Sequence, residues 1–195
     1  MHYLLLPFAL LLPGFSQAHE HEHRSHQHDS LQAHVHGEAQ LDIVLEGKLL
    51  ELQLHSPAMN LAGFEHAPAN AREQARLIAV REFLSQPEKV FTLPTEAGCA
   101  LERQAVSSEL FGAVAVDEDH LALHDEASEG APADNHQDIH AYYQFSCSNT
   151  QALRSIDLRN LFRQYPGLHA LDVQLIGPQG QKGQTLNTRH TLVQF

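Results

Sequence analysis

Several residue types are scarce in this chain of 195 residues, and each scarcity argues against a class of function. The sequence has no tryptophan and only two methionines, which disfavours a methionine-based Cu(I) site. It has two cysteines, Cys99 and Cys147, which lie too far apart to form a CxxC redox or zinc motif. Soft sulfur ligands are therefore not expected to carry its chemistry.

Basic residues are also few. Twelve Lys and Arg stand against 24 Asp and Glu, so the formal net charge is −12 at pH 7. Nucleic acids and anionic membrane surfaces are not expected as partners, because both repel a chain of this charge. The same excess of carboxylates suits a protein that binds cations.

Long apolar runs are absent except at the start of the chain. Residues 1–18 are apolar, contain Pro and Gly, and end in the small residues Ser16 and Ala18. This pattern predicts a signal peptide cleaved after Ala18 and export to the periplasm, and the alternative is a buried N-terminal helix. We then expect a disordered histidine-rich tail over residues 19–33, one domain over 34–195, and no membrane span in the mature protein.

Catalytic motifs are missing as well. The sequence has no HExxH, no GxSxG and no Gly-rich phosphate loop. The mature chain is also too short for a (β/α)8 barrel and lacks its alternating strand-helix order. We therefore expect a protein that is not an enzyme, and a metal-dependent hydrolase is kept as an alternative.

The predicted export bears on the state of the two cysteines, because exported proteins form disulfides. An even pair in an exported chain most simply forms one disulfide, and the alternative is two buried free thiols. Cys99 and Cys147 lie in predicted strands on either side of an acidic insertion at residues 117–138. We expect a bridge between them to clamp the base of that insertion.

Histidine is what the sequence has in excess, with sixteen in all. Imidazole is the commonest protein metal ligand and is mostly unprotonated at neutral pH. The first candidate zinc ligands lie in the predicted tail among glutamates, and the alternative for this segment is a solvated charged tail. They are His19, His21, His23, His26 and His28.

A second candidate site is the segment HVHGE, just ahead of the first predicted strand. Residues two apart in an extended chain point to the same side, so His34, His36 and Glu38 could hold one zinc ion. An HxH pair also arises by chance in a histidine-rich chain. His55 and His66 flank the next loop, and each is either a further ligand or an ordinary hydrogen-bonded histidine.

The third candidate site is the insertion, which has eight acids and no Lys or Arg. Its composition predicts a flexible loop, and an acidic linker without metal is the alternative. Its histidines fall in two pairs four residues apart, which one helical turn would align. They are His120, His124, His136 and His140, with Asp117, Asp119, Asp125 and Asp138 as further oxygen donors.

Together these groups predict several bound Zn²⁺ ions. Zinc is not distinguished from Ni²⁺ or Cu²⁺ by ligand type alone, since copper binds a bare histidine site more tightly.

Apolar periodicity predicts an α+β fold, with antiparallel strands, two covering helices and two similar halves split by the insertion. The expected strands are residues 39–46, 49–56, 89–93, 99–106, 139–148, 169–177 and 185–194. The first expected helix is capped by Asn70, and its apolar stripe is Ala71, Ala75, Ile78, Ala79 and Phe83. The second covers residues 155–164, while residues 57–69 form a loop and 178–184 a turn.

Four features taken together resemble a known family. They are HVHGEAQLDIVLEG at residues 34–47, SPAMNLAGFEHAP at 56–68, the insertion at 117–140 and the paired cysteines. In this order they resemble the ZrgA-like zinc uptake proteins. The resemblance implies a periplasmic zinc binder that assists acquisition beside a zinc importer, with His34, His36, His66 and the insertion histidines as ligands. A metal buffer or detoxification sink without handover has the same chemistry and is the alternative.

We expect the zinc capacity of the exported chain to fall below about pH 6, because imidazolium has no lone pair to offer a metal. Zinc competition titrations against a chelator at pH 7.5 and at pH 5.5 measure this capacity. Equal capacity at the two pH values would contradict imidazole ligation.

Overall fold

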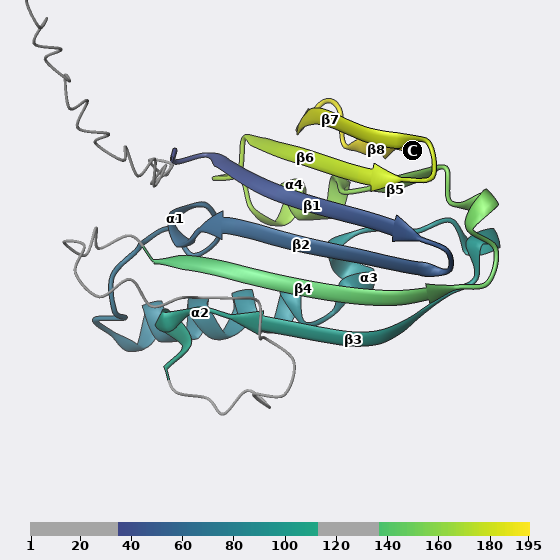
Figure 1. The fold of residues 1–195 in the computed structure, drawn as a ribbon. Helices are drawn as coiled ribbons and strands as arrows, with labels where there is room; N and C mark the ends of the chain where they lie inside the picture. The colour runs from purple at the N-terminus through teal and green to yellow at the C-terminus, as the bar shows by residue number, and fades with distance from the viewer. Residues whose placement is uncertain (1–34, 113–136) are drawn as a thin grey trace, which may run out of the picture. The chain divides into compact units, whose positions relative to one another are not determined.

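The computed structural model describes residues 35–112 and 137–195, so the predicted signal peptide, the tail and most of the insertion lie outside it. Six of the described strands form one sheet in the order β3-β4-β2-β1-β6-β7 (Figure 1). They are β1 (Glu38–Glu46), β2 (Leu49–Pro57), β3 (Cys99–Ser107), β4 (Asp138–Cys147), β6 (Ala170–Gly177) and β7 (Gly180–Asn187). A small second sheet pairs β5 (Ser155–Asp157) with β8 (Leu192–Gln194).

The large sheet is mixed. Four of its five strand pairs are antiparallel, and β1 pairs with β6 in parallel. The predicted α+β class is confirmed, whereas the prediction of antiparallel strands holds for only part of the sheet. β1 and β6 are far apart in the chain, so no hairpin turn forces them into opposite directions.

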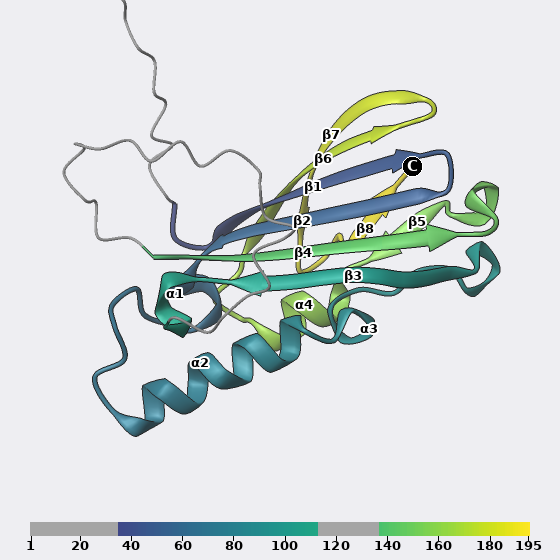
Figure 2. The ribbon, with the colours of Figure 1, turned by 60° about the horizontal axis from the view of Figure 1, so that its bottom comes forward.

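The described helices cover one face of this sheet, and none of them lies on the other, hereafter the open face (Figure 2). The helices are α1 (Ala58–Leu61), α2 (Ala71–Leu84), α3 (Pro87–Val90) and α4 (Arg159–Gln164). Side chains that point toward them form the core, and Ile43, Leu52 and Tyr143 are at most 1% exposed. The Tyr143 hydroxyl donates a hydrogen bond of 2.7 Å to the Leu84 carbonyl, which ties β4 to α2.

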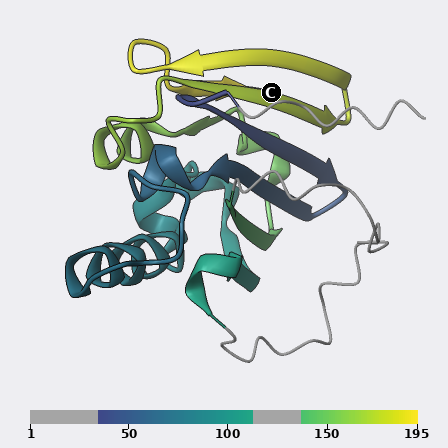
Figure 3. The ribbon, with the colours of Figure 1, turned by 90° about the vertical axis from the view of Figure 1, so that its left-hand side faces the viewer.

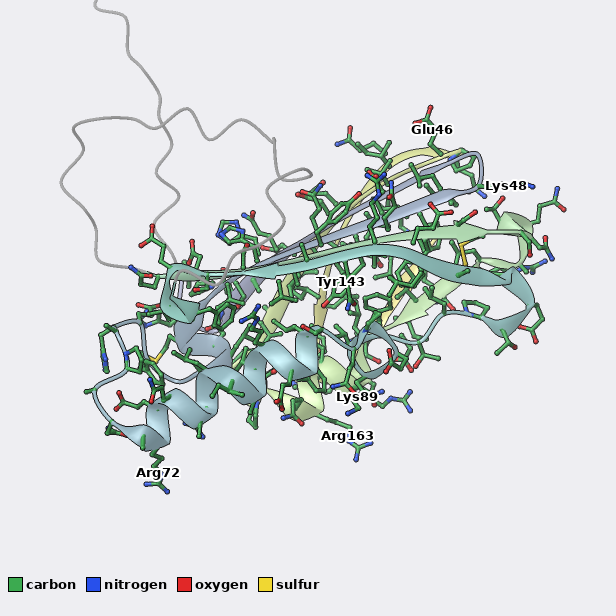
Figure 4. The ribbon with its side chains drawn as sticks, turned by 90° about the horizontal axis from the view of Figure 1, so that it is seen from below. Glu46, Lys48, Arg72, Lys89, Tyr143 and Arg163 are labelled. Atoms are coloured by element: carbon green, nitrogen blue, oxygen red, sulfur yellow. A yellow bond between two sulfur atoms is a disulfide. The ribbon has the colours of Figure 1, made fainter. Side chains whose placement is uncertain are left out.

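The outer surface of the helical layer carries basic side chains. Figure 4 shows Arg72, Lys89 and Arg163 pointing away from the sheet, while Tyr143 lies inside the molecule. The open face of the sheet is instead built from the outward positions of the strands, which alternate with the buried ones. Its side chains are mostly polar, so this face is available for binding without loss of core packing.

Helix α2 begins where the sequence predicts. The Asn70 side chain accepts a hydrogen bond of 3.0 Å from the Glu73 N–H, which satisfies one unpaired donor of the first turn. The buried face differs from the predicted apolar stripe, because Leu77, Val80 and Leu84 face the sheet and Ile78 is 56% exposed. Both sides of α2 are apolar, and larger side chains gain more free energy from burial than the alanines of the predicted stripe.

Several short segments also differ from the predicted elements. Residues 58–61, expected in a loop, form α1. The strand predicted at residues 89–93 is wrong, because residues 87–90 form α3 and, within 89–93, only Thr92 makes an isolated β-bridge, to Asp157. Pro87 lies in the first turn of α3, where the backbone N–H of a helix has no helical partner in any case. Residues 155–157 form β5 ahead of α4, and β7 begins at Gly180, inside the predicted turn.

The predicted disulfide between Cys99 and Cys147 is confirmed. The two residues pair directly across β3 and β4. The prediction that the bridge clamps the base of the insertion is wrong, because the insertion connects the other ends of these strands, at Ser107 and Asp138. The covalent bond therefore fixes β3 against β4 at the end of the pair remote from the insertion.

No helix within residues 35–112 or 137–195 is long and apolar enough to cross a membrane.

Replacing both cysteines by alanine is expected to lower the free energy of unfolding by about 3–4 kcal/mol, because the bridge restricts the unfolded chain. Urea unfolding of the oxidised protein and of the double variant measures this difference. Reduced wild-type protein is the matched control and should unfold at the same urea concentration as the double variant. A double variant as stable as the oxidised protein would contradict the expectation.

Candidate metal centre

A row of polar side chains crosses the open face of the sheet at one end. His140 on β4 pairs with His55 on β2, His55 pairs with Gln40 on β1, and Gln40 pairs with Asp172 on β6. Directly opposed residues of neighbouring strands point to the same face, with Cβ atoms about 4.5–5.5 Å apart. Strand register therefore brings together side chains that are widely separated in the sequence.

His55, Asp138 and His140 form a compact group within this row. One potential ligand atom from each residue lies within 4.8 Å of those of the other two. The His55 and His140 ring centroids are 4.4 Å apart, and His55 Nε2 lies 2.8 Å from Asp138 Oδ2. This group, hereafter the His55 cluster, lies where β4 begins and β2 ends, at the end of the sheet seen in Figure 3.

The local sequence explains why these three side chains face outward. Ile139 and Ala141 are 0% and 2% exposed in the core, so Asp138 and His140 alternate onto the open face. On β2, Leu54 and Ser56 are buried, and His55 between them points outward. Burial of the apolar positions thus sets the orientation of all three polar side chains.

The donor set suits a borderline divalent cation. Two imidazole nitrogens and one carboxylate oxygen are a common three-ligand set for zinc, and water can take the fourth position. Ligand atoms of a tetrahedral zinc site are about 3.3 Å apart at the usual bond lengths of about 2.0–2.1 Å. Atoms already within 4.8 Å of one another reach this spacing by small side-chain rotations.

The surroundings of the cluster differ in exposure and charge. The Asp138 side chain is 16% exposed and that of His55 is 43% exposed, so the carboxylate is the more sheltered partner. Asp42 and Asp172 are exposed on the same face, where their charge attracts cations. An ion can therefore approach the cluster from solvent across a negatively charged surface.

Tyr142 occupies the next outward position on β4. Burial and the hydrogen bond that its hydroxyl donates to Glu51 raise the pKa of Tyr142 to about 12. The phenol is therefore protonated at neutral pH and is a poor metal ligand there. Asp138 and His140 are therefore the stronger candidate ligands at this end of β4.

Of the predicted ligands within the described residues, His140 joins the cluster and three others lie elsewhere. His36 approaches Glu65, with 3.2 Å between Nε2 and Oε2. The Glu38 backbone carbonyl accepts a hydrogen bond from Asn60. The His66 ring stacks on Phe64, and its Nδ1 lies 2.9 Å from the Ala67 carbonyl oxygen.

The remaining predicted ligands lie outside the described residues. They are His19, His21, His23, His26, His28, His34, His120, His124 and His136.

Two members of the cluster were not selected as ligands by sequence reasoning. His55 remained a loop histidine or a ligand, and Asp138 was only a further oxygen donor of the insertion. The signal that identifies them is alternation about the buried Ile139, combined with a contact spanning 83 residues of sequence between β2 and β4. The contact between β2 and β4 cannot be predicted from a local sequence pattern.

The fold and the cluster define an α+β protein with a histidine-carboxylate group suited to metal on an open sheet face. Comparison with protein families gives a match over residues 33–195 to the ZrgA family of zinc uptake proteins. The chain belongs to this family, as its sequence motifs suggest, and a zinc-related role follows. A comparison with curated protein sequences finds no significant match.

Replacing His55 and His140 together by alanine is expected to weaken binding of one zinc ion by at least about tenfold, since loss of even an outer partner of a ligand has that effect. The test uses a tract-free chain, in which asparagine replaces His19, His21, His23, His26, His28, His120, His124 and His136. Competition with a chromophoric chelator measures the affinity.

His190→Ala is the matched control, because His190 is an exposed histidine on a different part of the fold. It should leave zinc binding unchanged. A double variant that binds the same number of zinc ions, with the same affinities, as the tract-free chain would exclude the His55 cluster as a ligand set.

Proposed function

We propose that this protein captures Zn²⁺ in the periplasm at several sites and assists zinc acquisition by handing the ion to a zinc importer component. The observation that carries the proposal is the His55 cluster, whose three potential ligand atoms lie within 4.8 Å of one another. Membership of a zinc uptake family supports zinc as the cargo. The net charge of −12 supports attraction of cations over other partners.

The two kinds of histidine in the chain suit different steps. A site whose ligands are fixed by a sheet loses little conformational entropy on binding, so it is expected to hold zinc more tightly. The tail histidines at 19–28 and the insertion histidines are expected to bind more weakly and to raise the local concentration of zinc near the cluster. In this capture mechanism the tail and insertion histidines collect zinc, and the His55 cluster retains it.

The placement of the cluster favours a carrier over an enzyme. His140 is exposed on the open face, so a bound ion can be reached from solvent and exchanged with another protein. Uptake and release of the same ion need such access, whereas catalysis needs an enclosed position for a substrate beside the metal. We therefore propose that the protein is not an enzyme.

We expect His55→Ala/His140→Ala to lower cellular zinc in the bacterium that encodes the protein, when the variant replaces the wild-type gene and zinc is scarce. Elemental analysis of washed cells and growth in chelator-treated medium measure the effect, with His190→Ala as the control. The protein level is checked in each strain.

Unchanged zinc content under scarcity, together with lower tolerance of excess zinc, would contradict acquisition and identify a metal sink. Unchanged growth and zinc content under both conditions would contradict a role in zinc homeostasis for the cluster.

A further inference from the structure

His36 and Glu65 come together at the entry to β1 from positions 29 residues apart in the sequence. The distance between His36 Nε2 and Glu65 Oε2 is 3.2 Å. The Glu65 side chain is only 10% exposed, while that of His36 is 52% exposed. A sheltered carboxylate thus faces an imidazole that solvent can still reach.

The backbone beside His36 is held by a buried side chain, Asn60, which is 4% exposed. Asn60 Oδ1 accepts a hydrogen bond of 2.6 Å from the Gly37 N–H. Its Nδ2 donates to the Glu38 carbonyl at 2.7 Å and to Ser56 Oγ at 3.3 Å. One amide therefore fastens the residues that follow His36 to α1 and to the end of β2.

The same turn is fastened from its other side by the segment that opens β6. The Gly37 carbonyl accepts hydrogen bonds from the backbone N–H groups of His169 and Ala170, at 2.7 and 2.9 Å. Gly37 has φ of +91°, and a Cβ there would lie 2.8 Å from His169 Nδ1. Only glycine fits this position without strain, and the hydrogen bonds on both sides of it hold the turn that presents His36.

Glu65 is placed by its neighbours in the loop after α1. Phe64, directly before it, is 7% exposed and packs in the core. The Ala62 carbonyl accepts a hydrogen bond of 3.3 Å from Arg76 of α2, which ties the start of this loop to the helix. Both partners of the His36–Glu65 pair are therefore mounted on backbone that is fixed before any ligand binds.

We propose that His36 and Glu65 are two of the ligands of a second divalent-cation site. The 3.2 Å between the ring nitrogen and the carboxylate oxygen is close to the spacing of about 3.3 Å between ligand atoms of tetrahedral zinc. A cation can take the place of the shared proton with little movement of either side chain. The preorganised turn lowers the entropy lost on binding.

This site has no residue in common with the His55 cluster, although Asn60 also donates a hydrogen bond to Ser56 Oγ, next to His55 on β2. The cluster depends on pairing between β2 and β4, whereas the second site depends on Asn60, the Gly37 turn and the loop after α1. The proposal therefore does not require zinc at the cluster. If one of the two sites does not bind zinc, binding at the other can still be tested directly.

The experiment uses the tract-free chain carrying His34→Asn, His55→Ala and His140→Ala, so that the other predicted histidine ligands near His36 and the histidines of the cluster are removed. Zn²⁺ competition titration and Co²⁺ absorption are measured on this background and on the same chain with His36→Ala or Glu65→Gln. We expect one remaining ion on the background and a loss of affinity of at least about tenfold in each variant.

The matched controls are His190→Ala and Glu82→Gln, an exposed histidine and an exposed carboxylate outside the site. Both should bind zinc as the background does. Circular dichroism checks the fold, and the long-range ¹H–¹⁵N spectrum of the histidine rings shows whether zinc shifts the His36 signals.

Two outcomes would overturn the proposal. In one, Glu65→Gln keeps the zinc affinity of the background and only lowers the melting temperature, which identifies a hydrogen-bonded pair with a folding role. In the other, the background binds no zinc and the His36 ring signals do not respond to it.

Discussion

The pairing of β2 with β4 is the interaction on which the candidate site depends. It joins a strand near the start of the domain to a strand that follows the insertion, and its register places His55 opposite His140. A shift of one residue would turn the whole outward set of one strand toward the core. The buried leucines of β2 and the apolar positions of β4 oppose that shift, so hydrophobic burial on one face holds the candidate metal ligands in place on the other.

Local elements of this fold were predictable from the sequence because their signals are local. The β1–β2 hairpin follows from alternating leucines around Gly47, and the start of α2 follows from Asn70. Outside this hairpin the partner of a strand was not predictable, since a strand pattern states which side is apolar and not which other strand lies beside it. His140 was therefore identified as a candidate ligand, but its association with His55 was not.

The sequence also did not show which polar side chains have a structural role. SPAMNLAGFEHAP marks a specialised segment, and the structure separates its parts by function. Asn60 is buried and hydrogen bonded to the backbone of the Gly37 turn, while Glu65 reaches the His36 ring. The sequence does not distinguish a buried amide that organises backbone from a sheltered carboxylate that meets an imidazole, because the partners of both, at Gly37 and His36, lie 23 and 29 residues away.

The location of the disulfide has a consequence for how this chain can vary. Cys99 and Cys147 set the alignment of β3 and β4 from the end opposite the insertion, so the connection between Ser107 and Asp138 is not needed to define it. The entropy of closing a flexible connection grows only with the logarithm of its length, at about 0.6 kcal/mol for each doubling. The number of residues in this connection can therefore change between related chains at little cost in stability while the sheet stays the same.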